Sequence, residues 1–159
     1  MIENFQKKKI NYTNAILFNH DSKYRKTKFL IPKIIFLLKT NKKIKIQKLI
    51  NENICGDFSH AEDICEGIYK IITSKKKIRR IILSSGKMTK INDIIYHLQE
   101  KFKINNYNFN FNLNSNNKKC TAIVGDNSFA KQILKWKPKK NVFLASEELY
   151  KRINTESKQ

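Results

Sequence analysis

The chain has 159 residues, of which 40% are hydrophobic and 11% aromatic, so its composition excludes a disordered protein and allows one domain with a hydrophobic core. Its formal net charge of +20 at pH 7 would suit an anionic partner such as a nucleic acid or a nucleotide. The lysines are nevertheless scattered along the chain beside abundant Asn and Ile, as in proteins from AT-rich genomes, and aromatic residues do not alternate with them as in a base-stacking surface. Genome bias therefore explains the charge better than nucleic-acid binding does.

We expect a cytoplasmic protein without a secretory signal or a membrane span. The basic residues 1–9 are not followed by an apolar core, and the apolar run 29–38 is too short for a bilayer. Cys55, Cys65 and Cys120 are an odd number of cysteines without CxxC spacing. This pattern argues against both a disulfide framework and a zinc site, and it suits a reducing compartment.

The first predicted elements are short. The apolar run Ala15–Phe18 predicts a buried strand, and the polar stretch Asn19–Lys28 predicts a loop. Ile31–Thr40 predicts a helix with Pro32 in its first turn, where a missing N–H costs nothing. In Lys43–Lys48 isoleucines alternate with polar residues, which predicts a strand.

A turn at Gly56–Ser59 and a helix over His60–Ser74 are predicted next. Asp57 or Ser59 can cap the helix, and Cys65 is expected on its buried face. The apolar residues at helical spacing are Ala61, Ile64, Cys65, Ile68, Ile71 and Ile72.

Predicted strands and helices continue to alternate after residue 74. Arg79–Ser84 predicts an isoleucine-rich strand, and Ile91–Phe102 predicts an amphipathic helix that Thr89 can cap. Phe109 and Phe111 alternate as in a strand, within a stretch rich in Asn.

Two helices are predicted near the carboxyl end, after a short strand at Thr121–Val124. The first is capped by Asn127 or Ser128 and ends before Trp136, which we expect to be a packing anchor with its N–H satisfied. The second runs from Val142 to Ile153.

These elements predict a single α/β domain. The domain is expected to span residues 10–153, between a frayed basic start at 1–9 and a polar tail at 154–159.

The first predicted strand leads into candidate ligand contacts. Asn19-His20-Asp21-Ser22 follows the carboxyl end of that strand, where open α/β sheets bind ligands. Arg25 offers a forked set of donors to phosphate oxygens, and Lys33 lies at a helix amino terminus, beside free backbone N–H groups. Taken alone, these residues favour a simpler interpretation, a polar turn with a solvated His20 and a solvated Lys33.

Three further stretches extend the pattern: Phe29-Leu-Ile-Pro-Lys33, Gly56-Asp-Phe-Ser-His-Ala-Glu-Asp63, and Gly125-Asp126 with Lys135-Trp-Lys-Pro138. Together with Asn19–Ser22 they resemble the carboxyl-terminal half of the GDP-mannose 4,6-dehydratase family, which is an extended short-chain dehydrogenase/reductase of the NAD-dependent epimerase/dehydratase type. The resemblance covers most of the chain. It implies the late strands of a Rossmann sheet together with a small substrate-binding domain, in a family whose full-length members are roughly twice as long.

The resemblance also implies roles for four residues. His20 and Arg25 match positions that contact NADP in the family. Asn19 matches a residue that hydrogen-bonds the nucleotide sugar, and Lys33 matches a lysine near the substrate diphosphate. It assigns no catalytic residue and no metal ligand in this chain.

Two phosphate or nucleotide contacts of the family are missing. Gly56 stands where the family has an arginine that contacts the diphosphate, and Asn116–Cys120 replaces a segment whose arginine and glutamate hold the nucleotide. We interpret Asp57 and Asp63 as caps and loop anchors, and His60 as a helix-terminal residue rather than a base.

The cofactor-binding half is missing as well. The four glycines are far apart and form no GxGxxG loop. Tyr24 and Lys28 have the spacing of the family's catalytic Tyr-Lys pair, but they fall in a predicted loop, which indicates a chance match. The family removes water from GDP-mannose with a bound NADP that is reduced and reoxidised, and we expect this chain alone to bind nucleotide sugar weakly and not to catalyse that reaction.

Three hypotheses about the chain stay open. It forms a complex with a separately encoded amino-terminal half or with copies of itself, or it is a decayed remnant, or it is an independent binding module. A basic nucleic-acid-binding protein is the alternative of a different class, and steep salt dependence would identify it.

Overall fold

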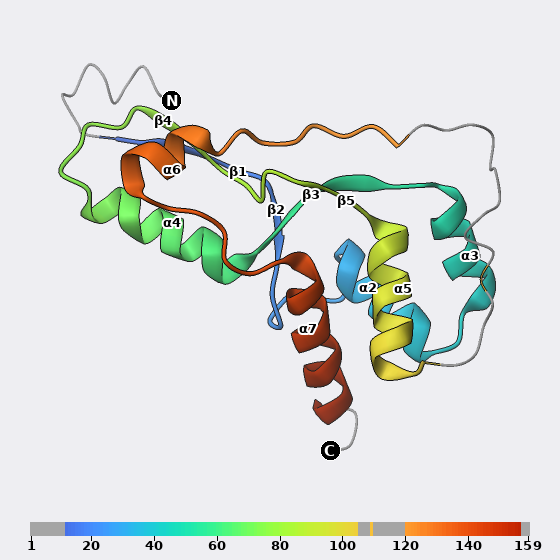
Figure 1. The fold of residues 1–159 in the computed structure, drawn as a ribbon. Helices are drawn as coiled ribbons and strands as arrows, with labels where there is room; N and C mark the ends of the chain where they lie inside the picture. Colours follow the sequence, from blue (N-terminus) through green and yellow to red (C-terminus); the bar gives the residue numbers. More distant parts are fainter. Residues whose placement is uncertain (1–11, 105–108, 110–119, 157–159) are drawn as a thin grey trace.

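The structure is a computed structural model that describes residues 12–104, 109 and 120–156 (Figure 1). Strands and helices alternate along most of the described residues, and two of the strand pairs are parallel, as the predicted α/β class requires. Along the described residues the elements are β1 (Asn14–Leu17), β2 (Asn19–Asp21), α2 (Leu30–Lys39), α3 (Lys43–Asn51), β3 (Cys55–His60), α4 (Ala61–Thr73), β4 (Arg80–Leu83), β5 (Met88–Lys90), α5 (Ile91–Phe102), α6 (Ser128–Leu134) and α7 (Val142–Glu156).

The strands form two small sheets that meet where β1 passes into β2. β1 pairs in parallel with β4, whereas β2 pairs in parallel with β3, and β3 pairs antiparallel with β5. Ala15, Ile81 and Leu83 face a hydrophobic cluster, but Ile16 and Leu17 of β1 are 38% and 40% exposed. In the described part of the chain, β1 has a strand neighbour on one edge only.

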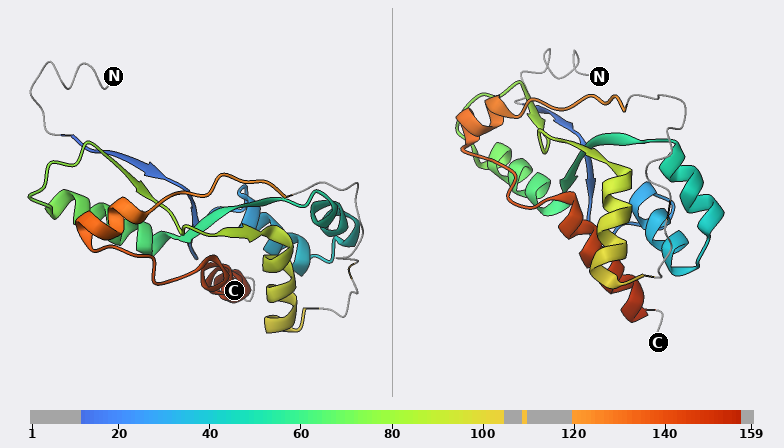
Figure 2. Two further views of the ribbon diagram at one scale, coloured as in Figure 1. Left: turned by 45° about the horizontal axis from the view of Figure 1, so that its top comes forward. Right: turned by 45° about the vertical axis from the view of Figure 1, so that its right-hand side comes forward.

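Two separate hydrophobic clusters hold the helices in place. One lies among α2, α3, α5 and α7, and the other lies between α4, α6 and the β1–β4 sheet. Figures 1 and 2 show these two groups of helices at opposite ends of the molecule, with β2 and β3 running between them. The region after β1 is therefore the junction between the two clusters.

Residues 43–48 begin helix α3, so the predicted strand was wrong. Ile46 and Ile50 of α3 are buried at helical spacing, whereas Ile44 is 87% exposed. Two alternating isoleucines are too few to distinguish the two-residue period of a strand from the 3.6-residue period of a helix. The packing of α3 against α2 favours the helix.

Three other local predictions were wrong. Asn19–Asp21 is strand β2 rather than loop, and Gly56–Ser59 lies within β3 because β2 and β5 pair with it from both sides. Thr121–Val124, within the described residues, runs without a strand partner. These segments are short, and their pairing depends on residues far away in the chain.

The amino terminus of α4 is capped by His60, not by Asp57 or Ser59. The His60 Nδ1 accepts a hydrogen bond from the backbone N–H of Glu62 at 3.2 Å. Cys65 of α4 is exposed, not buried.

The caps of α5 and α6 also differ from the predictions. Lys90 precedes α5 without a side-chain cap, so Thr89 does not serve. Asn127 is the cap residue of α6 but makes no capping hydrogen bond, and the Asp126 carboxylate accepts from the Ser128 N–H at 2.9 Å instead.

The structure describes only some of the segments predicted near the ends of the domain and in the Asn-rich stretch. Helix α7 runs to Glu156, beyond its predicted end. Phe109 is buried, whereas residues 1–9, Phe111 and the replaced segment 116–119 lie outside the described residues.

Candidate functional site

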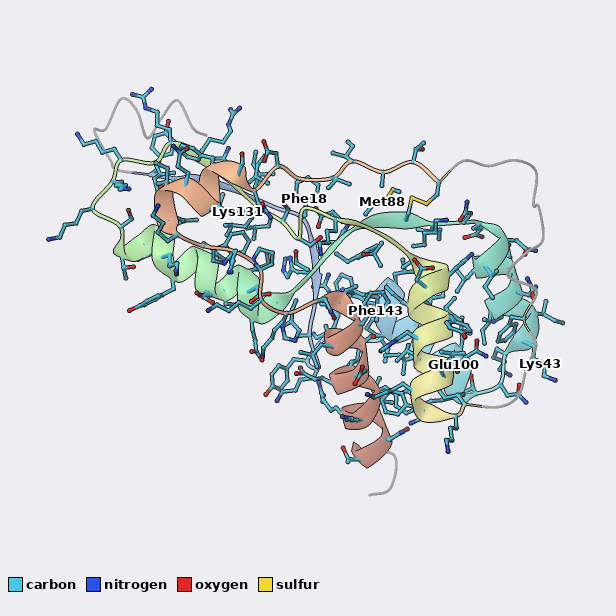
Figure 3. The ribbon with its side chains drawn as sticks, viewed as in Figure 1. Phe18, Lys43, Met88, Glu100, Lys131 and Phe143 are labelled. Carbon is cyan, nitrogen blue, oxygen red and sulfur yellow. A yellow bond between two sulfur atoms is a disulfide. The ribbon has the colours of Figure 1, made fainter. Side chains whose placement is uncertain are left out.

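The first candidate residues lie where the two sheets meet. Phe18 links β1 to β2, and its N–H donates to Leu83 of β4 at 3.2 Å. Nδ1 of His20 lies 2.8 Å from the Phe18 carbonyl oxygen, which holds the imidazole against its own strand. Asn19 is exposed, whereas Asp21 at the end of β2 is 7% exposed. Figure 3 shows the labelled Phe18 at this junction.

Asp21 and Arg25 form an ion pair across the turn after β2. Arg25 Nε lies 3.5 Å from Asp21 Oδ1, and the guanidinium carbon lies 3.7 Å from the centre of the Phe29 ring. Burial raises the pKa of Asp21 to about 6, although the charges of Arg25 and His20 act in the opposite direction. The site thus contains a buried carboxyl that titrates close to neutral pH.

Lys33 lies on the exposed side of α2. Its neighbours Ile31, Pro32 and Ile34 are buried in the first cluster, so the helix period turns Lys33 outward. In the described part of the structure, no hydrogen bond or ion pair joins its ammonium group to Asn19, His20 or Arg25. The structure therefore gathers the first three predicted contacts on one strand and its turn, and places Lys33 on the next helix.

Asp57 anchors three segments, as its interpretation as a loop anchor expects. Its carboxylate is 1% exposed and accepts hydrogen bonds from the N–H groups of Ser85, Gly86 and Gly125, at 2.9, 3.1 and 3.1 Å. The Ser85 hydroxyl also donates to it. The preceding residue, Gly56, has little room, because a Cβ there would lie 2.9 Å from the Phe58 ring.

Asp63 and Trp136 also have the structural roles that we expected. The Asp63 carboxylate accepts from the N–H groups of Lys139 and Lys140, at 2.9 and 2.7 Å. The indole N–H of Trp136 donates to the Asp63 carbonyl at 2.9 Å, and Trp136 is 1% exposed. Both residues fix the chain between α6 and α7 against α4.

His60, Glu62 and Glu148 form a group that could in principle hold a cation. Their ligand atoms lie within 4.8 Å of one another, and His60 Nε2 is 3.4 Å from Glu148 Oε2. However, the Lys140 ammonium group already pairs with Glu62, and His60 Nδ1 is occupied as a cap. Glu148 escaped sequence reasoning because it is 88 residues from His60.

A disulfide joins Cys55 to Cys120, so the expectation of free thiols was wrong for two of the three cysteines. The two Cα atoms are 6.0 Å apart, and the bridge closes a sequence separation of 65 residues. Figure 3 draws it as a yellow bond near the labelled Met88. Such a pairing cannot be read from spacing, and the cysteine argument for a reducing compartment no longer holds.

Across the described residues, each helix is too short or too polar to serve as a bilayer-spanning segment.

A family model identifies the family of this chain, and solved structures show its fold. Residues 1–149 match the family model described as GDP-mannose 4,6 dehydratase, whereas no curated protein sequence matches the chain. Among solved structures, UDP-glucuronic acid 4-epimerase from Bacillus cereus, in complex with NAD, superimposes with a TM-score of 0.72 at 14% identity, over 97% of this chain and 48% of its own.

Two other solved structures give the same picture. RMD from Pseudomonas aeruginosa, complexed with NADPH, has a TM-score of 0.69 at 13% identity, over 98% of this chain and 51% of its own. The dTDP-glucose 4,6-dehydratase from Bacillus anthracis, in complex with NAD, has a TM-score of 0.71 at 10% identity, over 99% of this chain and 49% of its own. The chain thus spans about half the length of these proteins, and it belongs to the GDP-mannose 4,6-dehydratase family, with the fold of the extended short-chain epimerases and dehydratases.

Proposed function

We propose that this chain is the nucleotide-sugar-binding half of a GDP-mannose 4,6-dehydratase-like protein, and that it does not dehydrate GDP-mannose alone. The observation that carries the proposal is the family match over residues 1–149, combined with a fold that spans about half of each solved relative. The chain offers neither a glycine-rich phosphate loop nor a helical Tyr-Lys pair. Turnover accordingly requires groups from elsewhere.

Four residues are proposed as ligand contacts. His20 and Arg25 would contact the nicotinamide cofactor, NADP, and Asn19 and Lys33 would contact the GDP-sugar. The position of Asn19 and His20 at the carboxyl end of β1 supports this assignment, because ligands of parallel α/β sheets bind there. Solved relatives are complexed with NAD or NADPH, which supports a nicotinamide dinucleotide without choosing between the two.

Within the described residues, one edge of β1 has no strand neighbour, and this edge supports a protein partner. The Asn14 and Phe18 N–H groups point toward β4 and donate to Arg79 and Leu83, so the alternation of a strand turns the Ala15 and Leu17 N–H groups toward the opposite edge. Unpaired edge groups beside exposed apolar side chains are a template for another strand. We propose that an amino-terminal, cofactor-binding half pairs there, and a second copy of this chain is the other candidate.

Calorimetric titration of the chain with GDP, UDP and a DNA oligonucleotide tests the function. GDP is expected to bind more tightly than UDP, and Lys33→Gln is expected to weaken GDP binding relative to Lys43→Gln, a control at an exposed residue of α3. DNA binding that weakens steeply with salt, without preference for GDP, would instead support the basic nucleic-acid-binding alternative.

The missing arginine at position 56 sets the expected strength of binding. A charge-assisted phosphate contact is worth about 1.5–3 kcal/mol, so GDP binding by this chain is expected to be weak. Gly56→Arg is not a clean way to restore it, because the Phe58 ring occupies the adjacent space.

A further inference from the structure

Asp21 and Arg25 face each other with one unsatisfied atom each. Asp21 Oδ1 and Arg25 Nε are both buried and lack a hydrogen-bond partner, although they lie 3.5 Å apart as an ion pair. A buried donor or acceptor without a hydrogen-bond partner costs folding free energy. Asp21 Oδ1 and Arg25 Nε–H are an acceptor and a donor that can satisfy each other. A small rotation of the guanidinium would let Arg25 Nε–H donate a hydrogen bond to Asp21 Oδ1.

The Phe29 ring provides the second constraint on Arg25. The guanidinium lies over this ring at 3.7 Å, a geometry that favours a planar cation. One edge of the guanidinium faces Asp21 and one face covers Phe29. The side chain is 33% exposed although its Nε is buried, so the Nη groups are the donors that remain for a ligand.

Stability does not explain an aspartate at position 21. Burial raises its pKa to about 6, which means that its ionised form costs free energy in the folded chain. A neutral asparagine of similar size would avoid that cost. A carboxyl kept in such a place, beside a cation, is characteristic of functional sites.

We propose that Asp21 is a positioning residue, whose carboxylate fixes the Arg25 guanidinium over Phe29 with its Nη donors turned toward a phosphate of the bound dinucleotide. This inference rests on the proposed function, because it takes Arg25 as a cofactor contact. Asp21 itself touches no ligand and acts through Arg25.

Ionisation of Asp21 makes this arrangement dependent on pH. Above about pH 6 the carboxylate is charged and orients Arg25, whereas below that pH protonation releases the guanidinium. The other titratable or charged groups near Asp21 come from its own turn and from β3, α4 and α7, which pack on β2. Besides Arg25, His20 acts on the Asp21 carboxyl, and His60 of β3 lies opposite Asp21 in the strand register. Glu62 of α4 and Glu148 of α7 lie beside His60.

Arginine-detected ¹⁵N NMR of the full chain tests the positioning without any ligand. The Arg25 Nε–H is expected to exchange much more slowly than the Nε–H of a free arginine at pH 8, and this protection, always measured against free arginine at the same pH, is expected to be lost at pH 5 and in Asp21→Asn. Asp21→Glu, which keeps the charge, should retain it. Protection relative to free arginine that is the same at both pH values, or unchanged in Asp21→Asn, would overturn the proposal. The pH comparison on the natural chain stands even if a variant fails to fold.

NADPH fluorescence titration tests the proposed contact between Arg25 and a phosphate of the dinucleotide. Asp21→Asn is expected to weaken NADPH binding about tenfold at pH 8, the effect of one charge-assisted hydrogen bond, and to have little effect at pH 5. Asp21→Glu should restore binding. If Arg25 responds to Asp21 by NMR but the natural chain binds no NADPH, the cofactor assignment in the proposed function fails and the phosphate part of this inference fails with it. If Arg25 responds to Asp21 by NMR but the natural chain and Asp21→Asn bind NADPH equally well at pH 8, only the proposed contact of Arg25 with a phosphate is overturned.

Discussion

At the scale of single residues, buried carboxylates organise this molecule. Asp57 gathers the turn after β4 and the segment before α6 onto β3, and Asp63 fixes the approach to α7. Each carboxylate accepts several backbone N–H groups that no other described side chain satisfies. The two residues connect segments that are distant in sequence, so they matter for the fold rather than for proton transfer.

Replacing Asp57 with alanine is therefore expected to be strongly destabilising. The N–H groups of Ser85, Gly86 and Gly125 lose their acceptor, and we expect a decrease in unfolding free energy of about 2–4 kcal/mol. Urea denaturation followed by circular dichroism measures it. Asp93→Ala, on the exposed side of α5, is the control and should change stability by about 0.5 kcal/mol. Similar effects of the two substitutions would contradict the role of Asp57.

The raised pKa of Asp21 predicts a pH-dependent stability difference. Between its ordinary pKa of 3.8 and its folded pKa of about 6, the folded chain binds a proton that the unfolded chain has lost. The contribution of Asp21 to stability is therefore complete below pH 3.8 and is lost as pH rises to about 6. Asp21→Asn is expected to be more stable than the natural chain above pH 6, by on the order of 1–2 kcal/mol.

Thermal unfolding of both chains at pH 4.0 and pH 7.5 checks this expectation. The difference between the two chains should be small at the lower pH and larger at the higher one. A natural chain that is the more stable at pH 7.5 would show that the Arg25 pair outweighs burial.

Sequence reasoning found residues that need a partner in the folded chain, but it did not identify which distant residue supplies that partner. Trp136 was predicted as a packing anchor with its N–H satisfied, and this N–H donates to the Asp63 carbonyl, 73 residues away in the sequence. Glu148 beside His60 and the Cys55–Cys120 bridge involve partners more than 60 residues apart. No local pattern carries that information. The roles assigned to Asn19, His20, Arg25 and Lys33 stay predictions.

At the scale of secondary-structure elements, the close approach of α4 to β4 depends on Gly67. A Cβ on Gly67 would lie 2.7 and 2.9 Å from the two methyl groups of Leu83 and 3.2 Å from the Trp136 ring. Leu83 is 0% exposed and Trp136 is 1% exposed, so neither can move aside easily. The glycine lets the helix lie directly on the strand.

Gly67→Ala is expected to lower stability although alanine is the better helix former. Overpacking a buried contact costs about 1–3 kcal/mol, which exceeds the gain in helix propensity of about 1 kcal/mol over most of that range. Ile72→Ala, on the same helix at a side chain that is 76% exposed, serves as the control and should be nearly neutral. Denaturation midpoints compare the two, and a Gly67→Ala chain more stable than the natural one would refute the packing argument.

Long periodic segments were predictable and short ones were not. Helix α5 matches its predicted bounds, Ile91–Phe102, because its apolar residues repeat at helical spacing over several turns. The alternation in Lys43–Lys48 covers too few residues to exclude a helix. Strands β2 and β5 exist because β3 pairs with both, and that pairing is set by the tertiary fold.

At the scale of the whole molecule, the disulfide ties the segment before α6 to β3. Cys120 is joined to Cys55, and Gly125 of the same segment is bonded to Asp57. Two attachments therefore hold this segment along one strand, one covalent and one made of hydrogen bonds. Reduction would leave only the second.

Removal of the disulfide is expected to destabilise the chain by about 2–4 kcal/mol, because it frees a long loop in the unfolded state. The Cys55→Ser/Cys120→Ser double variant and the natural chain with reductant should unfold alike, whereas Cys65→Ser should unfold like the oxidised natural chain. Thiol titration under denaturing conditions should detect Cys65 alone before reduction. Detection of all three thiols would contradict the bridge.

We propose that this chain contributes the nucleotide-sugar site and part of the cofactor site of a dehydratase, whose glycine-rich loop and catalytic Tyr-Lys pair are supplied elsewhere. The most direct test is an NMR titration of the ¹⁵N-labelled chain with GDP-mannose and NADP, since one measurement reports binding and conversion together. We expect the amide signals of Asn19 and Lys33 to shift with GDP-mannose and those of His20 and Arg25 to shift with NADP, while no signals of a 4-keto sugar appear. Accumulation of a 4-keto sugar, or shifts that leave all four of these residues unchanged, would contradict the proposal.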